Sequence, residues 1–197
     1  MKRSQLLEEV AVRVLIADDE PIIRMGLQSM LEEMGHEVLT AADGREALQQ
    51  ARRHWPDMTI LDIKMPYTDG LQAAAALSRV QPMPILLLTA FSDRDLVERA
   101  TDLPIHGYLV KPVKPGELAA AISVAVKRFE ETQRLKAQAT ELEEQLVARK
   151  LVDRAKAKLM VSGLSEEAAY KAIQRHARES RLSMRQVAEA ILKQRPE

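Results

Sequence analysis

Cysteine is absent from this chain of 197 residues, and so is any apolar run long enough to cross a bilayer. Without cysteine the protein can form neither a disulfide framework nor a thiolate zinc site. A membrane-spanning helix needs about 20 predominantly apolar residues. Glu8, Glu9 and Arg13 interrupt the N-terminal stretch, which argues against a secretory leader. We therefore expect a cytoplasmic protein that does not bind a membrane.

The four histidines are scattered along the chain and do not have the spacing of metal ligands.

The formal charge is zero overall but unevenly distributed along the chain. Counted from the sequence, residues 1–115 carry −4, residues 116–148 carry −2 and residues 149–197 carry +6. An acidic front and a basic tail indicate different partners for the two ends. A solvated basic helix face is the alternative, and charge alone leaves both open.

Short apolar runs alternate with segments of helical spacing over the first 110 residues. Runs that are apolar throughout suit strands of a parallel sheet covered on both faces. Strict alternation of strand and helix predicts a doubly wound α/β fold, with five parallel strands in the flavodoxin-like order 2-1-3-4-5. We expect strands at residues 13–17, 37–41, 58–61, 85–88 and 108–110, and helices at 22–34, 45–54, 71–80 and 93–101.

The strand pattern stops at Pro115. Residues 117–150 contain neither proline nor glycine and are rich in strong helix formers. A helix of about 34 residues needs a surface to pack against, so we expect it to pair with its counterpart in a second copy as a coiled coil. The apolar spacing changes phase between Phe129 and Leu135, so an ideal heptad repeat over the whole length is not predicted.

Three more helical pieces are expected in the tail, each with a small apolar face. Gly163 is expected to end the first of them as a left-handed cap, and Ser165 to cap the second. The pieces are 151–161, 166 to about 179, and 184–193. We therefore predict a first domain at 1–115 with a fifth helix continuing to about 128, a helical linker at 116–148, and a small all-α domain at 149–197.

Polar side chains follow four of the five expected strands. Asp18 and Asp19 follow the first strand and Asp62 ends the third, while Thr89 and Lys111 follow the fourth and fifth. The carboxyl ends of parallel strands meet at one edge of the sheet, where such folds bind ligands. Each residue alone has an ordinary structural explanation, such as a helix cap. All five at successive strand ends instead predict one site.

Three carboxylates close together repel one another, so we expect a bound cation between them. Oxygen ligands without cysteine favour Mg²⁺, held by Asp18, Asp19 and Asp62. One carboxylate could then attack phosphorus, because the metal and Lys111 offset the charge on the phosphoryl oxygens. Thr89 would donate its hydroxyl to one of those oxygens.

The segments VLIADDE, ILDIKMPYTDGL, LLTAFS and YLVKP resemble those of bacterial response-regulator receiver domains, over about residues 12–128. The resemblance implies that Asp62 accepts a phosphoryl group from a sensor histidine kinase, and that Asp19 binds Mg²⁺ directly. It makes Thr89 the switch hydroxyl and Tyr108 the aromatic that changes rotamer. It also implies a cis peptide between Lys111 and Pro112. One departure is visible: Leu103–Gly107 replaces the Gly-Ala pair usual in the family.

The tail is similar to ANTAR, a three-helix RNA-binding module that follows receivers in transcription antitermination regulators. The matching residues are RKLVDRAKAKLM, then Gly163, then SEEAAYKAIQRHARESRLSMRQVAEAIL. The resemblance implies RNA hairpins in an mRNA leader as partners, and a homodimer through the long helix that phosphorylation promotes. Basic and aromatic side chains suit phosphates and unpaired bases; the expected RNA contacts are Lys156, Tyr170, Arg175, Arg178 and Arg185.

The expected function is thus a phosphorylated regulator that binds RNA hairpins, and not an enzyme, apart from phosphoryl acceptance and possible self-dephosphorylation. Two alternatives remain open at this stage. The chain could be a DNA-binding response regulator, although no recognition helix rich in base-reading side chains is evident. It could also be a phosphorelay protein whose tail binds a protein partner.

Overall fold

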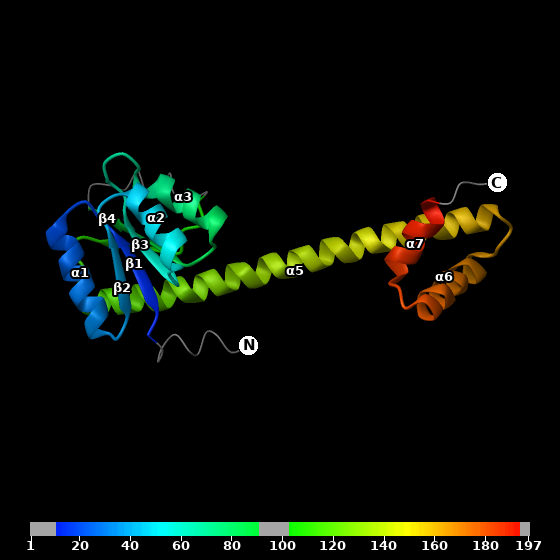
Figure 1. The fold of residues 1–197 in the computed structure, drawn as a ribbon. Coiled ribbons are helices and arrows are strands. Elements are labelled where there is room, and N and C mark those ends of the chain that lie inside the picture. Colours follow the sequence, from blue (N-terminus) through cyan, green and yellow to red (C-terminus); the bar gives the residue numbers. More distant parts are fainter. Residues whose placement is uncertain (1–10, 91–102, 194–197) are drawn as a thin grey trace. The chain divides into compact units, whose positions relative to one another are not determined.

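The computed structural model describes residues 11–90 and 103–193 (Figure 1). The chain forms two compact units, Met1–Gln133 and Arg134–Glu197, which are described separately. The helix expected at 93–101 lies outside the described residues. In the part that is described, no helix is long and apolar enough to span a bilayer.

The first unit is built on a five-stranded parallel sheet in the order β2-β1-β3-β4-β5, which confirms the predicted fold class. Three of the strands are one residue longer than predicted, because Asp62, Thr89 and Gly107 join the ladder. The strands are β1 Arg13–Ala17, β2 Glu37–Ala41, β3 Met58–Asp62, β4 Ile85–Thr89 and β5 Gly107–Val110.

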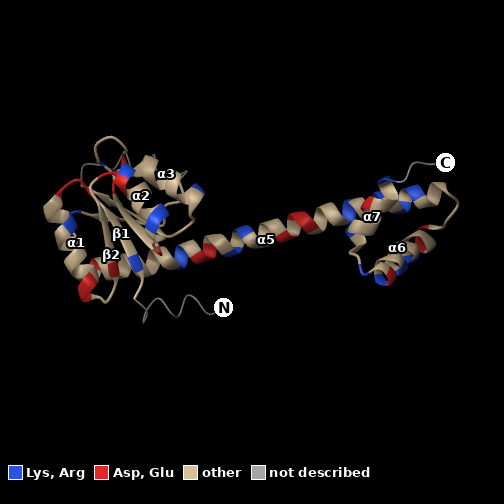
Figure 2. Ribbon diagram, in the orientation of Figure 1, with Lys and Arg blue, Asp and Glu red and all other residues tan. Residues whose placement is uncertain are grey.

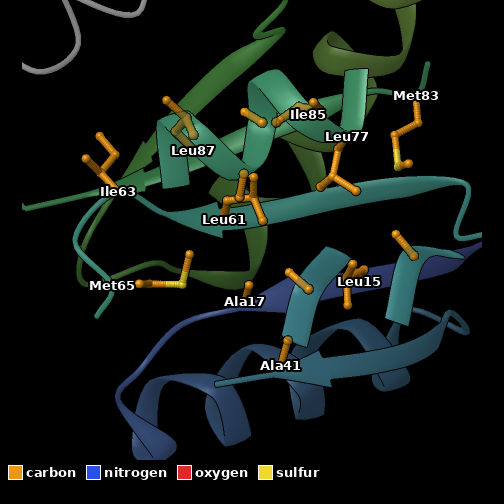
Figure 3. Close-up of a cluster of buried hydrophobic side chains, with 14 residues drawn as sticks. Leu15, Ala17, Ala41, Leu61, Ile63, Met65, Leu77, Met83, Ile85 and Leu87 are labelled. Atoms are coloured by element: carbon orange, nitrogen blue, oxygen red, sulfur yellow. The ribbon is translucent and has the colours of Figure 1, made fainter. Parts of the chain in front are cut away.

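Alternate residues of the strands face two separate apolar cores, as the period-2 geometry of a strand requires. One core packs strand residues such as Leu15 and Leu61 against the small residues of α2 and α3 (Figure 3). The other packs Ile16 and Ile60 against α1 and the start of α5. Because both faces are covered, β3 and β4 are buried at every position.

Three helices of this unit begin one residue earlier than predicted, because each starts at a proline or glycine. Pro21 suits the first turn of α1, where its missing N–H costs nothing. Asp43 and Asp69 cap α2 and α3 by accepting hydrogen bonds from backbone N–H groups of the first turn. The helices are α1 Pro21–Glu33, α2 Gly44–His54, α3 Gly70–Val80 and α5 Pro115–Val161.

The structure corrects one prediction about the tail. Residues 151–161 are not a separate helix but the last turns of α5, which is continuous over 47 residues. No glycine or proline occurs between Gly116 and Val161, so the sequence has no helix-terminating residue at 149–150. The helix ends instead at Val161, just before Gly163, whose φ of +98° is the expected left-handed conformation.

The second unit folds the end of α5 against α6 (Glu166–Ser180) and α7 (Met184–Lys193). Ser165 caps α6 as predicted, accepting a hydrogen bond from the N–H of Ala168 at 3.2 Å. The core is small and rich in alanine and valine, which limits the apolar area it buries. The buried residues of this core are Val152, Ala155, Ile173, Ala177, Val187 and Ala188.

Candidate functional site

The three acidic residues predicted at the carboxyl edge of the sheet lie together. Ligand oxygens of Asp18, Asp19 and Asp62 are all within 4.8 Å of one another. Asp18 is fully buried and Asp62 is 5% exposed, whereas Asp19 is open to solvent. Asp62 is the last residue of β3, and the other two follow β1, its neighbour in the sheet. The cluster thus results directly from the strand order.

Lys111 is the cation of this cluster. Its Nζ lies 2.8 Å from Oδ2 of Asp18 and 3.0 Å from Oδ2 of Asp62. Lys111 follows β5, and its backbone N–H donates to the carbonyl of Thr89 at 2.9 Å, which fixes the residue at the same sheet edge. The peptide between Lys111 and Pro112 is cis, as expected.

Burial and charge act in opposite directions on these groups. Burial raises the pKa of Asp62, the nearby ammonium of Lys111 opposes this, and the carboxylates of Asp18 and Asp19 add to the rise. Burial alone would lower the pKa of Lys111, but hydrogen bonds to Asp18 and Asp62 outweigh it and raise the pKa. The lysine therefore stays charged, and an ionised Asp62 depends on positive charge beside it.

The donor set fits a hard divalent cation. The Oδ2 atom of Asp18 is buried and, apart from the ammonium of Lys111, has no partner among the described residues. Carboxylate oxygens at this separation match the ligand preference of Mg²⁺, which keeps several waters and takes one or two carboxylates. One ammonium does not balance three carboxylates, so a further positive charge would be stabilised here.

Thr89 and Tyr108 lie near this edge but differ in their surroundings. Thr89 is the buried last residue of β4, and its hydroxyl donates to the carbonyl of Ala90 at 3.0 Å. Its neighbour in the sheet is Val110, which places it beside the strand that leads to Lys111. Tyr108 is 58% exposed on β5, so its ring points away from the core.

Two residues of the site were not anticipated from the sequence. The carboxylate of Glu20 reaches Nζ of Lys111 at 3.4 Å, although it is mostly exposed. Gly70 opens α3 so close to β3 that a Cβ there would overlap the carbonyl oxygen of Asp62. The signals were present: Glu20 completes the acidic run that begins at Asp18, and Asp69-Gly70 is a cap-and-glycine pair at a helix start.

Lys and Arg residues of the second unit lie on the end of α5, on α6 and on α7 (Figure 2). Two of the predicted RNA contacts already have acidic partners. Nζ of Lys156 lies 3.1 Å from Asp153 and 3.0 Å from Glu166, and its side chain is only 18% exposed. Arg185 pairs with Glu189 one turn along α7 at 3.0 Å.

The other three predicted contacts lie on α6. Tyr170 is 45% exposed. Arg175 and Arg178 are exposed on the side opposite the buried Ile173, and with Lys171 they line a shallow surface hollow. Because residues three and four apart are neighbours on a helix, these three cations share one face of α6.

The fold and the acid cluster define a class of protein, and the comparisons with known sequences agree. Residues 14–123 match the family described as Response regulator receiver domain, and residues 140–192 match the ANTAR domain. The chain belongs to the response regulators that carry a receiver followed by an ANTAR domain. Proteins of this kind are regulators rather than enzymes in the usual sense.

Among curated proteins, the chain is similar to the Transcriptional regulatory protein PdtaR of Mycobacterium tuberculosis. The two are 48% identical over 182 residues, which cover 91% of this chain and 89% of that protein. A probable transcriptional regulator, ycf27 of Guillardia theta, is 40% identical over 122 residues, 61% of this chain and 47% of that protein.

Solved structures match the first unit. A response regulator receiver domain protein from Clostridium thermocellum has a TM-score of 0.55 and 31% identity, covering 62% of this chain and 99% of that one. The chemotaxis response regulator CheY4 of Vibrio cholerae has a TM-score of 0.55 and 33% identity, covering 59% and 99%.

Proposed function

We propose that Asp62 is the phosphoacceptor of this receiver, and that phosphorylation controls RNA binding by the ANTAR domain. The observation that carries the first part is the position of Asp62, buried at the end of β3 with Nζ of Lys111 3.0 Å from its carboxylate. A carboxylate oxygen held this way can attack phosphorus in line, while the neighbouring ammonium offsets the charge on the transferred group.

Asp18, Asp19 and Asp62 are proposed to hold Mg²⁺. The bound ion would supply electrostatic stabilisation of the phosphoryl oxygens. Oδ2 of Asp18, which contacts Nζ of Lys111 at 2.8 Å, would turn to the cation, while Oδ1 accepts a hydrogen bond from the N–H of Glu20 at 2.9 Å, which fixes the carboxylate's orientation. Thr89 would give up its bond to Ala90 and donate to a phosphoryl oxygen, and Tyr108 would turn inward beside it.

The phosphodonor is proposed to be a sensor histidine kinase that docks beside the acid cluster. Two large apolar side chains at the start of α1 support this: Ile22 is 80% exposed and Met25 is 70% exposed. They follow the acidic residues 18–20 within one to two turns. Neighbouring exposed apolar side chains beside a reactive site suit a protein partner more than bulk water.

For the output, the proposed ligand is a hairpin RNA in an mRNA leader. The basic face of α6 formed by Lys171, Arg175 and Arg178 would neutralise phosphates, and the exposed ring of Tyr170 could stack on an unpaired base. Arg185, Lys156 and, within this face of α6, Lys171 are weaker candidates than Arg175 and Arg178, since each would have to leave an acidic partner, which for Lys171 is Glu167 at 2.7 Å. Holding the hairpin would prevent a terminator from forming, which is antitermination.

We propose that a homodimer formed through α5 couples phosphorylation of the receiver to RNA binding by the ANTAR domain. Leu135, Leu142 and Leu146 lie on one side of the helix and are all more than half exposed. Pairing with a second copy would cover this stripe. Phosphorylation would act through differential affinity for the paired state, and two RNA modules on one dimer would gain affinity from effective concentration.

The test compares the untreated protein with protein treated with beryllofluoride and Mg²⁺, a mimic of phosphorylated Asp62. The mimic should increase both the dimer fraction in sedimentation and the affinity for hairpin RNA, and duplex DNA should not compete. Leu142→Glu with Leu146→Glu should abolish both gains, whereas Ala137→Glu with Thr140→Glu, on the opposite side of α5, should leave them intact. Tighter RNA binding by a protein that stays monomeric would contradict the dimer; displacement by duplex DNA would contradict the RNA assignment.

A further inference from the structure

Glu20 contacts the catalytic cation but has no part in the chemistry proposed so far. It is neither one of the three proposed metal ligands nor the phosphoacceptor, yet its Oε1 lies 3.4 Å from Nζ of Lys111. Two other carboxylates contact the same ammonium, those of Asp18 and Asp62, and both are buried. The side chain of Glu20 is 57% exposed, so it is the contact of Lys111 that opens to solvent.

The local structure of Glu20 indicates that its side chain serves this contact and not helix α1. Glu20 is the N-cap residue of α1, but within the described ranges its side chain makes no cap hydrogen bond. The N-cap residues of α2, α3 and α6 are Asp43, Asp69 and Ser165, and each accepts a hydrogen bond from the first turn of its helix. Short polar side chains are preferred at this position because their oxygen reaches those N–H groups. The longer glutamate reaches Lys111 instead.

The backbone of Glu20 is fixed beside Asp18. Its N–H donates to Oδ1 of Asp18 at 2.9 Å, and its carbonyl accepts hydrogen bonds from the N–H groups of Ile23 and Arg24, both at 3.1 Å. Because both backbone groups are bonded, movement of Glu20 is left to its long side chain, which has many rotamers. The carboxylate can therefore follow a small displacement of the Lys111 ammonium.

Lys111 has to change partners before Asp62 can react. Its Nζ lies 2.8 Å from Oδ2 of Asp18, a proposed ligand of the cation, and 3.0 Å from Oδ2 of Asp62, the proposed nucleophile. An ammonium that stayed between these two atoms would repel a cation and occupy the nucleophile. It must nevertheless remain close, because it offsets the charge on the transferred group.

We propose that Glu20 is a positioning residue, which holds the ammonium of Lys111 beside the site when Asp18 and Asp62 exchange it for the cation. The inference rests on the proposed function of Asp62 and adds a role for a carboxylate that is neither ligand nor nucleophile. A shift of the ammonium toward Glu20 shortens the 3.4 Å contact and strengthens a charge-assisted hydrogen bond, which compensates for the partners that Lys111 loses. The lysine then stays within reach of a phosphoryl oxygen on Asp62.

Without this carboxylate, Lys111 should compete with Mg²⁺ for the acid cluster. In Glu20→Gln the ammonium keeps its contacts with Asp18 and Asp62, so Mg²⁺ binding should weaken about fivefold. Glu20→Asp keeps the charge but is one methylene shorter, and aspartate favours the N-cap position of α1. It should bind Mg²⁺ as weakly as Glu20→Gln. Glu32→Gln, an equal change of charge at an exposed position of the same helix, should bind Mg²⁺ like the parent protein.

A double-mutant cycle separates action through Lys111 from a direct effect of charge on the metal. Mg²⁺ dissociation constants are measured by calorimetry for the parent protein, Glu20→Gln, Lys111→Met and the double variant. The proposal predicts that Glu20→Gln has no effect in the Lys111→Met background, because no ammonium remains to be held. An equal loss in both backgrounds would overturn it, since Glu20 would then act on the cation directly. Parental affinity in Glu20→Asp would overturn it for the same reason.

The outcome for Glu20 can be told apart from the outcome for Asp62. Labelling by a small phosphodonor tests the phosphoacceptor whatever the role of Glu20. A parent protein that binds Mg²⁺ and is labelled on Asp62, with unchanged Mg²⁺ affinity in Glu20→Gln, would overturn the role of Glu20 alone. A parent protein that neither binds Mg²⁺ nor is labelled would overturn both.

Discussion

The imidazole of His106 stands edge-on to the ring of Phe129, with ring centroids 5.3 Å apart and planes at 77°. The same imidazole accepts a hydrogen bond at Nδ1 from the backbone N–H of Ile85 at 3.1 Å. His106 belongs to the turn Leu103–Gly107, where the sequence departs from the usual receiver pattern. In this protein the turn therefore joins the starts of β4 and β5 to α5.

Phe129→Ala should lower the free energy of unfolding of the first unit. An aromatic pair contributes about 0.5–1.5 kcal/mol beyond the area it buries, and the ring is only partly exposed. We expect a loss of about 1–3 kcal/mol by urea unfolding. Phe129→Leu, which keeps most of the apolar contact, should lose less. An alanine variant as stable as the parent would show that the pair does not hold α5 to the sheet.

Asp62→Asn should stabilise the metal-free protein at pH 7. The pKa of Asp62 is raised in the folded state by burial, so the folded protein holds this proton more tightly than the unfolded chain. The ionised carboxylate therefore costs stability above its folded pKa, and this cost disappears as the pH falls below about 4, where both states are protonated. Thermal unfolding from pH 3 to pH 8 should show the variant's advantage growing with pH.

Added Mg²⁺ gives the control for that experiment. It should raise the Tm of the parent protein and raise that of Asp62→Asn much less, because the variant has lost one of three carboxylates. An Asp62→Asn protein that is less stable than the parent at pH 7 without metal would contradict the electrostatic account of the site.

Ile22→Asp should slow phosphorylation by the cognate kinase while leaving labelling by a small phosphodonor unchanged. The side chain is exposed beside the acid cluster, and the variant removes an apolar contact without touching a carboxylate. We expect about a tenfold loss in transfer, the equivalent of about 1.4 kcal/mol. Arg52→Asp, an exposed change on α2, is the control. Equal losses with both phosphodonors would place Ile22 in the chemistry instead of the docking surface.

Gly70→Ala should impair phosphorylation because a Cβ at this position overlaps the carbonyl oxygen of Asp62. The end of β3 would have to shift, and the carboxylate would move away from Lys111. Gly26→Ala is the matched control, since the space around Gly26 on α1 is open and alanine favours a helix. Initial rates with a small phosphodonor should fall at least about tenfold for Gly70→Ala only. Equal rates in the two variants would contradict the positioning role of Gly70.

Much of the receiver fold follows from local pattern. Runs such as ILLL at 85–88 are apolar throughout, and the structure buries them between two layers of helices. Order and spacing also predicted that Asp18, Asp62 and Lys111 would meet, because parallel strands of known order bring their carboxyl ends to one edge. The helix cap at Ser165 and the left-handed conformation of Gly163 also depend only on neighbouring residues, so both could be predicted from the sequence.

Other features depend on contacts that no local pattern records. The hydrogen bond from Ile85 to His106 joins residues 21 positions apart, and the ring of Phe129 comes from a third element. The close approach of Gly70 to Asp62 depends on how α3 crosses the end of β3. The continuity of α5 through residues 149–161 was missed because the apolar spacing of residues 151–161 was interpreted as a separate helical piece, although no glycine or proline lies between residues 117 and 161.

The most direct test of the central claim is the site of phosphorylation. The protein is incubated with a small phosphodonor and Mg²⁺, and its intact mass is measured before and after acid treatment. One acid-labile phosphoryl group should be added to the parent protein, mapped to Asp62, and none to Asp62→Asn, because the amide is a far poorer nucleophile. Labelling of Asp62→Asn at the rate of the parent protein would contradict the account, since it would move the phosphoacceptor to another residue.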